Sequence, residues 1–219
     1  MNQVPIHSLL PEIQQALASH SQVILQAPTG AGKSTALPLA MLDWPQIQGK
    51  ILMLEPRRIA ARNVAHFIAA QRRESVGQSV GFRVRGESSI SAKTRLEVVT
   101  EGVLTRMIQQ DPELSEYGLI IFDEIHERHL TTDLGLALAL EVQASFREDL
   151  KIMAMSATLD GLPLSDLMPD AASLVSEGRS YPVSLSYRPS AAHQDWLPHM
   201  AKVIIEALSE HQHGSLLAF

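Results

Sequence analysis

The chain has 219 residues, a net charge of −6 and no cysteine. This length allows one complete α/β domain and excludes two of ordinary size. The composition, 45% hydrophobic and 19% charged, excludes a disordered or fibrous protein. The lack of cysteine excludes disulfide frameworks, thiolate zinc sites and cysteine nucleophiles. Because the sequence has no signal-peptide pattern and no long apolar run, we expect a cytoplasmic protein that does not enter a membrane.

Short apolar segments alternate with segments of helical length through most of the chain. This alternation is typical of βαβ units and predicts an α/β fold with a mostly parallel sheet. Several of the apolar segments have no polar alternation, so we expect helices on both faces of the sheet. The expected strands are Val23–Ala27, Ile51–Glu55, Leu96–Thr100, Leu119–Asp123 and Lys151–Ser156, and the expected helices are Lys33–Leu42, Ile59–Gln71, Gly102–Gln110 and Asp133–Phe146.

The pattern changes near Glu177–Tyr181, where a glycine and a proline precede an expected strand at Val183–Tyr187. The apolar run Ser215–Phe219 has the composition of a further strand. We therefore expect a first domain at residues 1–178 and the truncated opening of a second domain, strand, helix and strand, at residues 179–219. The helix between the two strands is predicted from apolar residues at helical spacing, namely Trp196, Met200, Val203, Ile204, Ala207 and Leu208.

A glycine-rich segment, Ala27–Thr35 (APTGAGKST), directly follows the first expected strand. It matches the phosphate-loop pattern except that Ala27 replaces the first glycine. Lys33 is placed to reach the β- and γ-phosphates of ATP, and the Ser34 hydroxyl to bind Mg²⁺. The alternative, a glycine-rich turn with an incidental lysine, does not explain why strand, loop and helix all fall where the motif requires. The residues expected to bind the nucleotide through backbone N–H groups and side chains are Thr29, Gly30, Ala31, Gly32, Lys33, Ser34 and Thr35.

Two carboxylates, Asp123 and Glu124, end the fourth expected strand. At the carboxyl end of a strand beside a phosphate loop, one carboxylate can hold Mg²⁺ and another can activate the attacking water. We assign Asp123 as a ligand of the metal and Glu124 as the general base. We also count Glu124 among the residues that bind the metal. The alternative is an acidic surface turn, which is common after strands. The phosphate loop in the same chain favours the catalytic interpretation.

Four strings extend this pattern in a fixed order. They are Pro56-Arg57-Arg58, Thr100-Glu101-Gly102, Asp123-Glu124-Ile125-His126 continuing into Glu127-Arg128, and Ser156-Ala157-Thr158. Over nearly all of residues 20–160 the chain resembles the DEAH-box group of superfamily 2 helicases. Ile125 stands where the group has alanine, a change that leaves both carboxylates and His126 in place. The strings Leu54–Arg62 (LEPRRIAAR) and Val80–Glu87 (VGFRVRGE) resemble a bacterial subgroup.

The resemblance implies a RecA-like P-loop NTPase domain that uses ATP and Mg²⁺ and, together with a second lobe, moves along RNA and unwinds it. A preference for RNA over DNA comes from the resemblance alone, because contacts to phosphates do not distinguish the two. The implied roles are catalysis for Lys33, Asp123, Glu124 and His126, nucleic-acid contact for Arg57, Arg58, Thr100, Glu101 and Gly102, and coupling of nucleotide state to lobe movement, through hydrogen bonds toward His126, for Ser156 and Thr158.

Simpler interpretations of these residues stay open. Arg57 and Arg58 are also compatible with a solvated surface pair, and Thr100 with an ordinary helix cap. For the whole chain, the alternative is a nucleotide-dependent RNA-binding or scaffolding module without motor activity. A general base such as Glu124 favours the enzyme, because a scaffold does not need one. We expect the chain without a second lobe to bind nucleotide and nucleic acid weakly and not to unwind a duplex.

Overall fold

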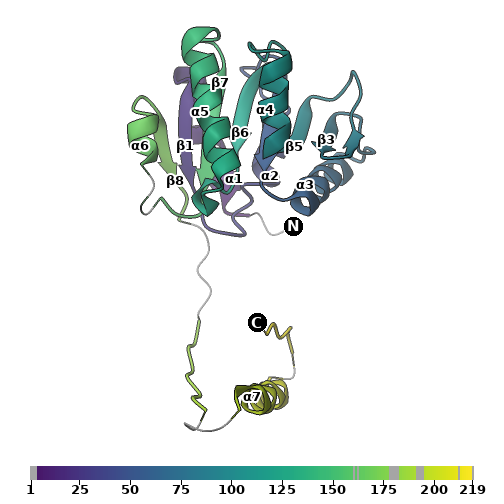
Figure 1. The fold of residues 1–219 in the computed structure, drawn as a ribbon, viewed down its shortest axis with the longest axis vertical. Coiled ribbons are helices and arrows are strands. Elements are labelled where there is room, and N and C mark those ends of the chain that lie inside the picture. Colours follow the sequence, from purple (N-terminus) through teal and green to yellow (C-terminus); the bar gives the residue numbers. More distant parts are fainter. Residues whose placement is uncertain are drawn as a thin grey trace. The chain divides into compact units, whose positions relative to one another are not determined.

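The computed structural model describes residues 4–159, 161, 163–177, 183–190, 195–211 and 213–218. The chain divides into two compact units, residues 1–179 and residues 180–219. The first unit is an eight-stranded sheet with helices on both faces (Figure 1). The α/β fold with a mostly parallel sheet is therefore confirmed. Along the described residues, no helix is both long enough and apolar enough to cross a lipid bilayer.

The sheet has the strand order β4-β3-β5-β2-β6-β7-β1-β8, and every pairing is parallel except that of β3 with β4. All five expected strands are present, each with its ends within two residues of the prediction. The strands are β1 (Gln22–Gln26), β2 (Lys50–Glu55), β3 (Val80–Val84), β4 (Glu87–Ser89), β5 (Leu96–Thr100), β6 (Tyr117–Phe122), β7 (Lys151–Ser156) and β8 (Ala172–Val175).

Three strands, β3, β4 and β8, were not expected from the sequence. Gly81 and Arg83 interrupt the apolar run of β3, and β4 is only Glu-Ser-Ser. β8 has four residues of alternating exposure at the edge of the sheet. Such short strands exist because a neighbouring strand offers hydrogen bonds, a condition that a local sequence pattern does not contain.

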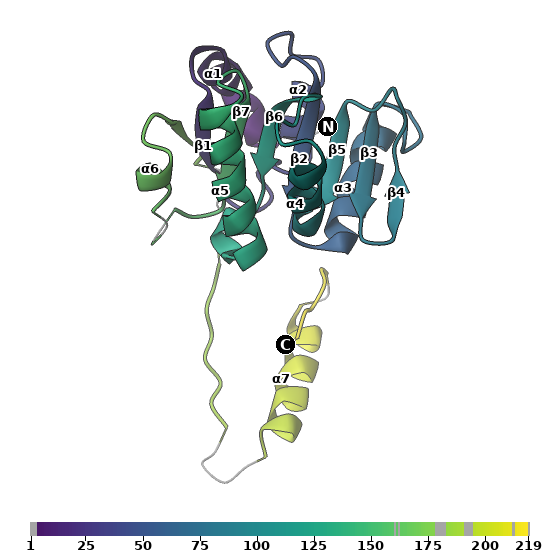
Figure 2. The same ribbon diagram turned by 45° about the horizontal axis from the view of Figure 1, so that its top comes forward.

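The helices form two layers, one on each face of the sheet (Figure 1, Figure 2). Alternate residues of the central strands belong to two different cores beneath these layers. Leu52 and Leu54 of β2, for example, belong to the core beneath α4 and α5, whereas Ile51 and Met53 belong to the core beneath α1, α2 and α3. The central strands are thus covered on both faces, as expected. The helices are α1 (Ile6–Ser19), α2 (Ala36–Met41), α3 (Arg58–Gln71), α4 (Glu101–Gln110), α5 (Leu130–Ser145) and α6 (Leu164–Leu167).

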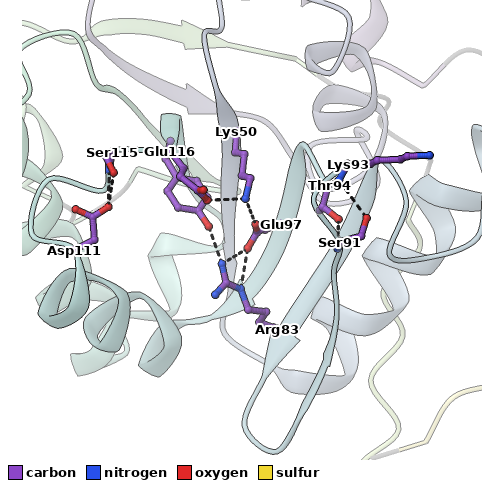
Figure 3. A network of polar contacts seen from close by, with 10 residues as sticks. Lys50, Arg83, Ser91, Lys93, Thr94, Glu97, Asp111, Ser115 and Glu116 are labelled. Atoms are coloured by element: carbon purple, nitrogen blue, oxygen red, sulfur yellow. Dashed lines mark hydrogen bonds and ion pairs between the residues drawn. The ribbon is translucent and has the colours of Figure 1, made fainter.

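An ion-pair network centred on a buried carboxylate joins neighbouring strands of the sheet (Figure 3). The Glu97 side chain of β5 is fully buried and lies 3.2 Å from Lys50 Nζ of β2. Arg83 of β3 pairs with the same carboxylate and donates a hydrogen bond to the Tyr117 hydroxyl of β6 at 2.8 Å. Four strands are thus tied together around the Glu97 carboxylate.

The second unit contains α7 (Trp196–Glu210), as the helical spacing predicted. The side chain of Arg188 pairs with Glu206 at 2.6 Å. The prediction of a strand at Val183–Tyr187 is wrong, because no described segment pairs with it. The prediction of a second strand is wrong over residues 215–218 for the same reason. A strand without a partner lacks the ladder of hydrogen bonds that defines it. Residues 178–181 of the expected boundary and Phe219 lie outside the described residues.

Candidate nucleotide and nucleic-acid site

The functional strings meet at one edge of the sheet because parallel strands present their carboxyl ends together. The phosphate loop follows β1, Pro56-Arg57-Arg58 follows β2, Thr100 ends β5, Asp123 follows β6 and Ser156 ends β7. In the sheet these strands are consecutive neighbours, in the order β5-β2-β6-β7-β1. Segments far apart in the sequence are thereby brought to one edge.

The phosphate loop turns twice through backbone conformations that favour glycine. Gly30 has a φ of +76° and Gly32 a φ of +97°. A Cβ on Gly32 would also lie 2.7 Å from a methyl group of Val4. Gly32 is therefore required both by its backbone angle and by the close packing of the segment before α1.

The helix expected to begin at Lys33 begins at Ala36 instead. Gly32 O accepts hydrogen bonds from Thr35 N at 3.4 Å and Leu37 N at 3.1 Å, so residues 32–35 form turns. The Lys33 side chain folds back over the loop, and its Nζ donates to Ala27 O at 2.7 Å. Only 3% of Lys33 is exposed. The ammonium group is therefore held inside the loop by backbone carbonyls.

Asp123 is the acidic centre of the site. It is 2% exposed, and its Oδ1 accepts a hydrogen bond from Glu124 N at 2.9 Å. Oδ2 is buried and has no hydrogen-bond partner within the described part of the chain. Burial raises the pKa of Asp123, while its interactions with Ser34, Glu55 and Lys33 lower it. The predicted metal ligands Asp123 and Ser34 therefore lie together.

A second buried carboxyl, Glu55, lies beside Asp123 and received no role from the sequence. It ends β2, next to β6, and is 4% exposed. Burial, and then the negative charge of Asp123, raises the pKa of Glu55 to about 9. The protonated Glu55 can donate a hydrogen bond to the Asp123 carboxylate. The signal in the sequence was a lone acidic residue at the end of the apolar strand Ile51–Leu54.

Replacing Glu55 with glutamine should stabilise the ligand-free chain, and increasingly so as the pH rises. The folded state holds the proton up to a pH of about 9, whereas the unfolded chain loses it near the ordinary value of 4.5. Wild-type stability is therefore complete below pH 4.5 and decreases between these two values. We expect a gain of roughly 2–4 kcal/mol at pH 8 that vanishes near pH 4.5. Urea unfolding of both proteins at several pH values measures this difference in the free energy of unfolding.

The matched control for this prediction is Glu12→Gln, because Glu12 is an exposed carboxylate on α1. We expect that control to change the free energy of unfolding by less than about 0.5 kcal/mol at every pH. A stability gain for Glu55→Gln that is equal at pH 5 and pH 8 would contradict a protonated Glu55.

Glu124 and His126 lie next to each other beyond the end of β6. Glu124 has a φ of +52°, a left-handed conformation that is costly for a residue with a side chain and is often found at functional sites. His126 Nδ1 lies 3.3 Å from Glu124 Oε2 and 3.4 Å from Ala157 N. A ring nitrogen either donates or accepts, so Nδ1 satisfies only one of these two neighbours at a time. Burial, and then the charge of Asp123, raises the pKa of Glu124.

The Ser156-Ala157-Thr158 string touches His126 through its backbone. The amide N–H of Ala157 donates a hydrogen bond to His126 Nδ1, whereas the Ser156 hydroxyl donates a hydrogen bond to Thr158 O. Ser156 O also accepts from Ala27 N at 3.0 Å, which joins the string to the start of the phosphate loop. The bond to His126 thus comes from Ala157, which received no role from the sequence, and the coupling role expected for Ser156 and Thr158 stays a prediction.

Arg57 and Arg58 are both exposed at the junction of β2 and α3. The Arg57 guanidinium pairs with Glu127 at 2.7 Å, although 72% of the Arg57 side chain is exposed. Glu127 lies in the short 3₁₀ helix η1 (Ile125–Glu127), and it also contacts His129 Nε2 at 2.9 Å. An ion pair this exposed is weak, so a phosphate can compete for Arg57.

Thr100, Glu101 and Gly102 lie at the start of α4, but they do not share one environment. Gly102 is exposed, and Thr100 makes no side-chain capping bond to α4. Glu101 is 7% exposed and accepts hydrogen bonds from the hydroxyls of Thr131 and Thr132. Direct contact between Glu101 and a nucleic acid does not fit this burial, so the expectation for Glu101 needs correction. The carboxylate turns inward, toward the hydroxyls of Thr131 and Thr132.

Residues 10–167 match the DEAD/DEAH box helicase family. The chain belongs to this family. The DEAH-box resemblance of the four strings is thereby confirmed. The matched residues include the phosphate loop and all four strings, and they end with α6.

The chain is 53% identical to the ATP-dependent RNA helicase HrpB of Escherichia coli over 219 residues, which cover 100% of this chain and 27% of that protein. It is 36% identical to the ATP-dependent RNA helicase HrpA of Escherichia coli over 221 residues, 99% of this chain and 17% of the relative. The crystal structure of Escherichia coli DEAH/RHA helicase HrpB matches with a TM-score of 0.90 over 95% of this chain and 27% of that chain. This family member thus spans 27% or less of the length of these relatives.

Proposed function

We propose that this chain is the ATP-binding lobe of an RNA helicase, which couples ATP hydrolysis to movement along RNA and to its unwinding. In this proposal residues 1–178 form a RecA-like lobe and residues 179–219 begin a second one. The observation that carries it is the meeting of Lys33, Asp123 and Glu124 at one edge of the sheet in a member of a helicase family.

Mg²⁺ fits the residues that would hold it. Asp123 offers a buried oxygen that no described residue satisfies, and the side chain of Ser34 interacts with the same carboxylate. Hard oxygen ligands of this kind suit Mg²⁺. When bound, the ion would neutralise charge on the phosphate oxygens. The buried negative charge shared by Asp123 and Glu55 favours a cation over a neutral occupant at this position.

Residues of the chain bind the phosphates, accept a proton from water and bind the nucleic acid. Lys33 exchanges its bond to Ala27 O for a phosphate oxygen of ATP, and the loop amides bind the neighbouring phosphates. Glu124 accepts the proton of the attacking water. Its raised pKa places it closer to the working pH, where a base both stays ionised and accepts a proton readily. Arg57, Arg58, Thr100 and Gly102 bind the nucleic-acid backbone from the adjacent strand ends.

ATP turnover with RNA and with DNA, compared side by side in the intact two-lobed protein, tests the function. We expect RNA to stimulate turnover and DNA to do so less. An ATPase that neither polymer stimulates would support a binding or scaffolding module instead.

Removal of both arginines tests the nucleic-acid surface in the chain itself. Arg57→Ala with Arg58→Ala should weaken binding of single-stranded RNA and make the slope of log K against log salt shallower by about 0.7 for each phosphate that is no longer neutralised. Fluorescence anisotropy at several salt concentrations measures this slope. The matched control is Arg73→Ala, an exposed arginine beyond the far end of α3. An equal effect of the control would show that only net charge matters.

A further inference from the structure

Glu101 is a buried carboxylate that joins the beginnings of two helices. It is the first residue of α4, and Thr131 and Thr132 lie in the first turn of α5. Thr131 Oγ1 donates to Glu101 Oε2 and Thr132 Oγ1 to Glu101 Oε1, so each carboxylate oxygen has its own donor. Thr132 is itself only 4% exposed. We call these three residues the α4–α5 clamp.

The clamp continues into close packing between α4 and α5. A Cβ on Gly135 of α5 would lie 3.2 Å from Leu104 Cδ2 of α4 and 3.5 Å from the ring of Phe122. The absence of a side chain at Gly135 therefore lets the two helices approach closely. Because packed interiors resist small deformations, a displacement at the start of α4 is passed to α5.

The first turn of α5 is tied in turn to the segment that carries Glu124. Thr132 N and Asp133 N donate to His129 O at 2.9 and 3.0 Å. Arg128 Nη2 pairs with Asp133 at 2.9 Å. Within the turn before α5, Glu127 N donates to Glu124 O at 2.9 Å. Together with the contact of His129 Nε2 to Glu127 Oε2 at 2.9 Å, these bonds link the clamp to Glu124.

We propose that Thr131 and Thr132 are positioning residues, which, through Glu101, transmit the binding of a nucleic-acid backbone at the start of α4 to the placement of Glu124. This inference rests on the proposed function. It gives a role to the carboxylate between Thr100 and Gly102, since this side chain is buried and joins α4 to α5. Nucleic acid at Gly102 shifts α4, and the clamp carries the shift to α5 and to the turn that precedes it.

The test uses Thr131→Val with Thr132→Val in the intact two-lobed protein. Valine keeps the shape of threonine and removes the hydroxyl, so Glu101 loses both donors. We expect turnover without RNA to stay within about twofold of wild type, and maximal stimulation by RNA to fall about 2- to 30-fold, the range found for residues that couple two sites. The RNA concentration that gives half-maximal stimulation should not change.

The matched control is Thr105→Val, because Thr105 lies one turn beyond Glu101 on α4 and its hydroxyl makes no hydrogen bond to any described residue. It should leave RNA stimulation unchanged. Glu101→Gln supplies a second variant, since an amide can accept from one hydroxyl and donate to the other. This variant should retain more stimulation than Glu101→Ala, and thermal unfolding shows whether each variant folds.

Equal losses of basal and stimulated turnover would show a general structural role and overturn the inference. Unchanged stimulation in the folded valine variant would overturn it as well, while leaving the proposed function intact. A wild-type protein that RNA does not stimulate would overturn both.

Discussion

Glu124→Gln is expected to reduce ATP turnover in the two-lobed protein by about 10²–10⁴-fold while ATP still binds. Glutamine has nearly the same shape but does not accept the water proton. Burial and the neighbouring Asp123 raise the pKa of Glu124, which makes its carboxylate a better base than an exposed glutamate. Single-turnover hydrolysis and a titration with labelled nucleotide separate the chemical step from binding.

A surface carboxylate provides the comparison for Glu124. Glu148→Gln changes an exposed residue beyond α5 and should leave turnover within about twofold. If Glu124→Gln retained more than a tenth of wild-type turnover, the base would have to be assigned to another residue.

Lys33→Met is expected to weaken nucleotide binding by at least about tenfold and to lower turnover by about 10²–10³-fold, as for other groups that stabilise developing negative charge. Methionine fills much of the same volume, but it carries no charge and does not bind the carbonyl of Ala27. The site then holds the acidic Asp123 and Glu124 without the cation that lowers the pKa of both carboxyls. Repulsion between these carboxylates and the nucleotide phosphates would add to the loss.

Nucleotide binding to the 219-residue chain, measured by calorimetry, checks the affinity for Lys33→Met. Lys93→Met is its control, because Lys93 is exposed on the loop before β5. Equal binding by both variants would remove Lys33 from the phosphate site. The lysine would then serve only to hold the loop through Ala27 O.

The sequence predicted most of the central sheet because buried parallel strands carry a strong local signal. A segment such as Leu119–Phe122 is apolar throughout, as expected for a strand that is buried on both faces of the sheet. The phosphate loop was equally clear, since Gly30, Gly32 and Lys33 have fixed spacing. Prediction failed where structure depends on a distant partner. Edge strands such as β4 and β8 exist through pairing, and a predicted strand at Val183–Tyr187 has no such pairing among the described residues.

The chemical types of the site residues were therefore determined by the sequence alone, through motifs whose spacing is local. Only the tertiary structure decided which of these residues meet. It placed Glu55 against Asp123 and turned Glu101 away from solvent toward Thr131 and Thr132. Burial and the approach of charges across neighbouring strands arise from packing between distant segments. The protonation state and the side-chain orientation of a carboxyl group follow from that packing. The residues next to it in the sequence do not contain this information.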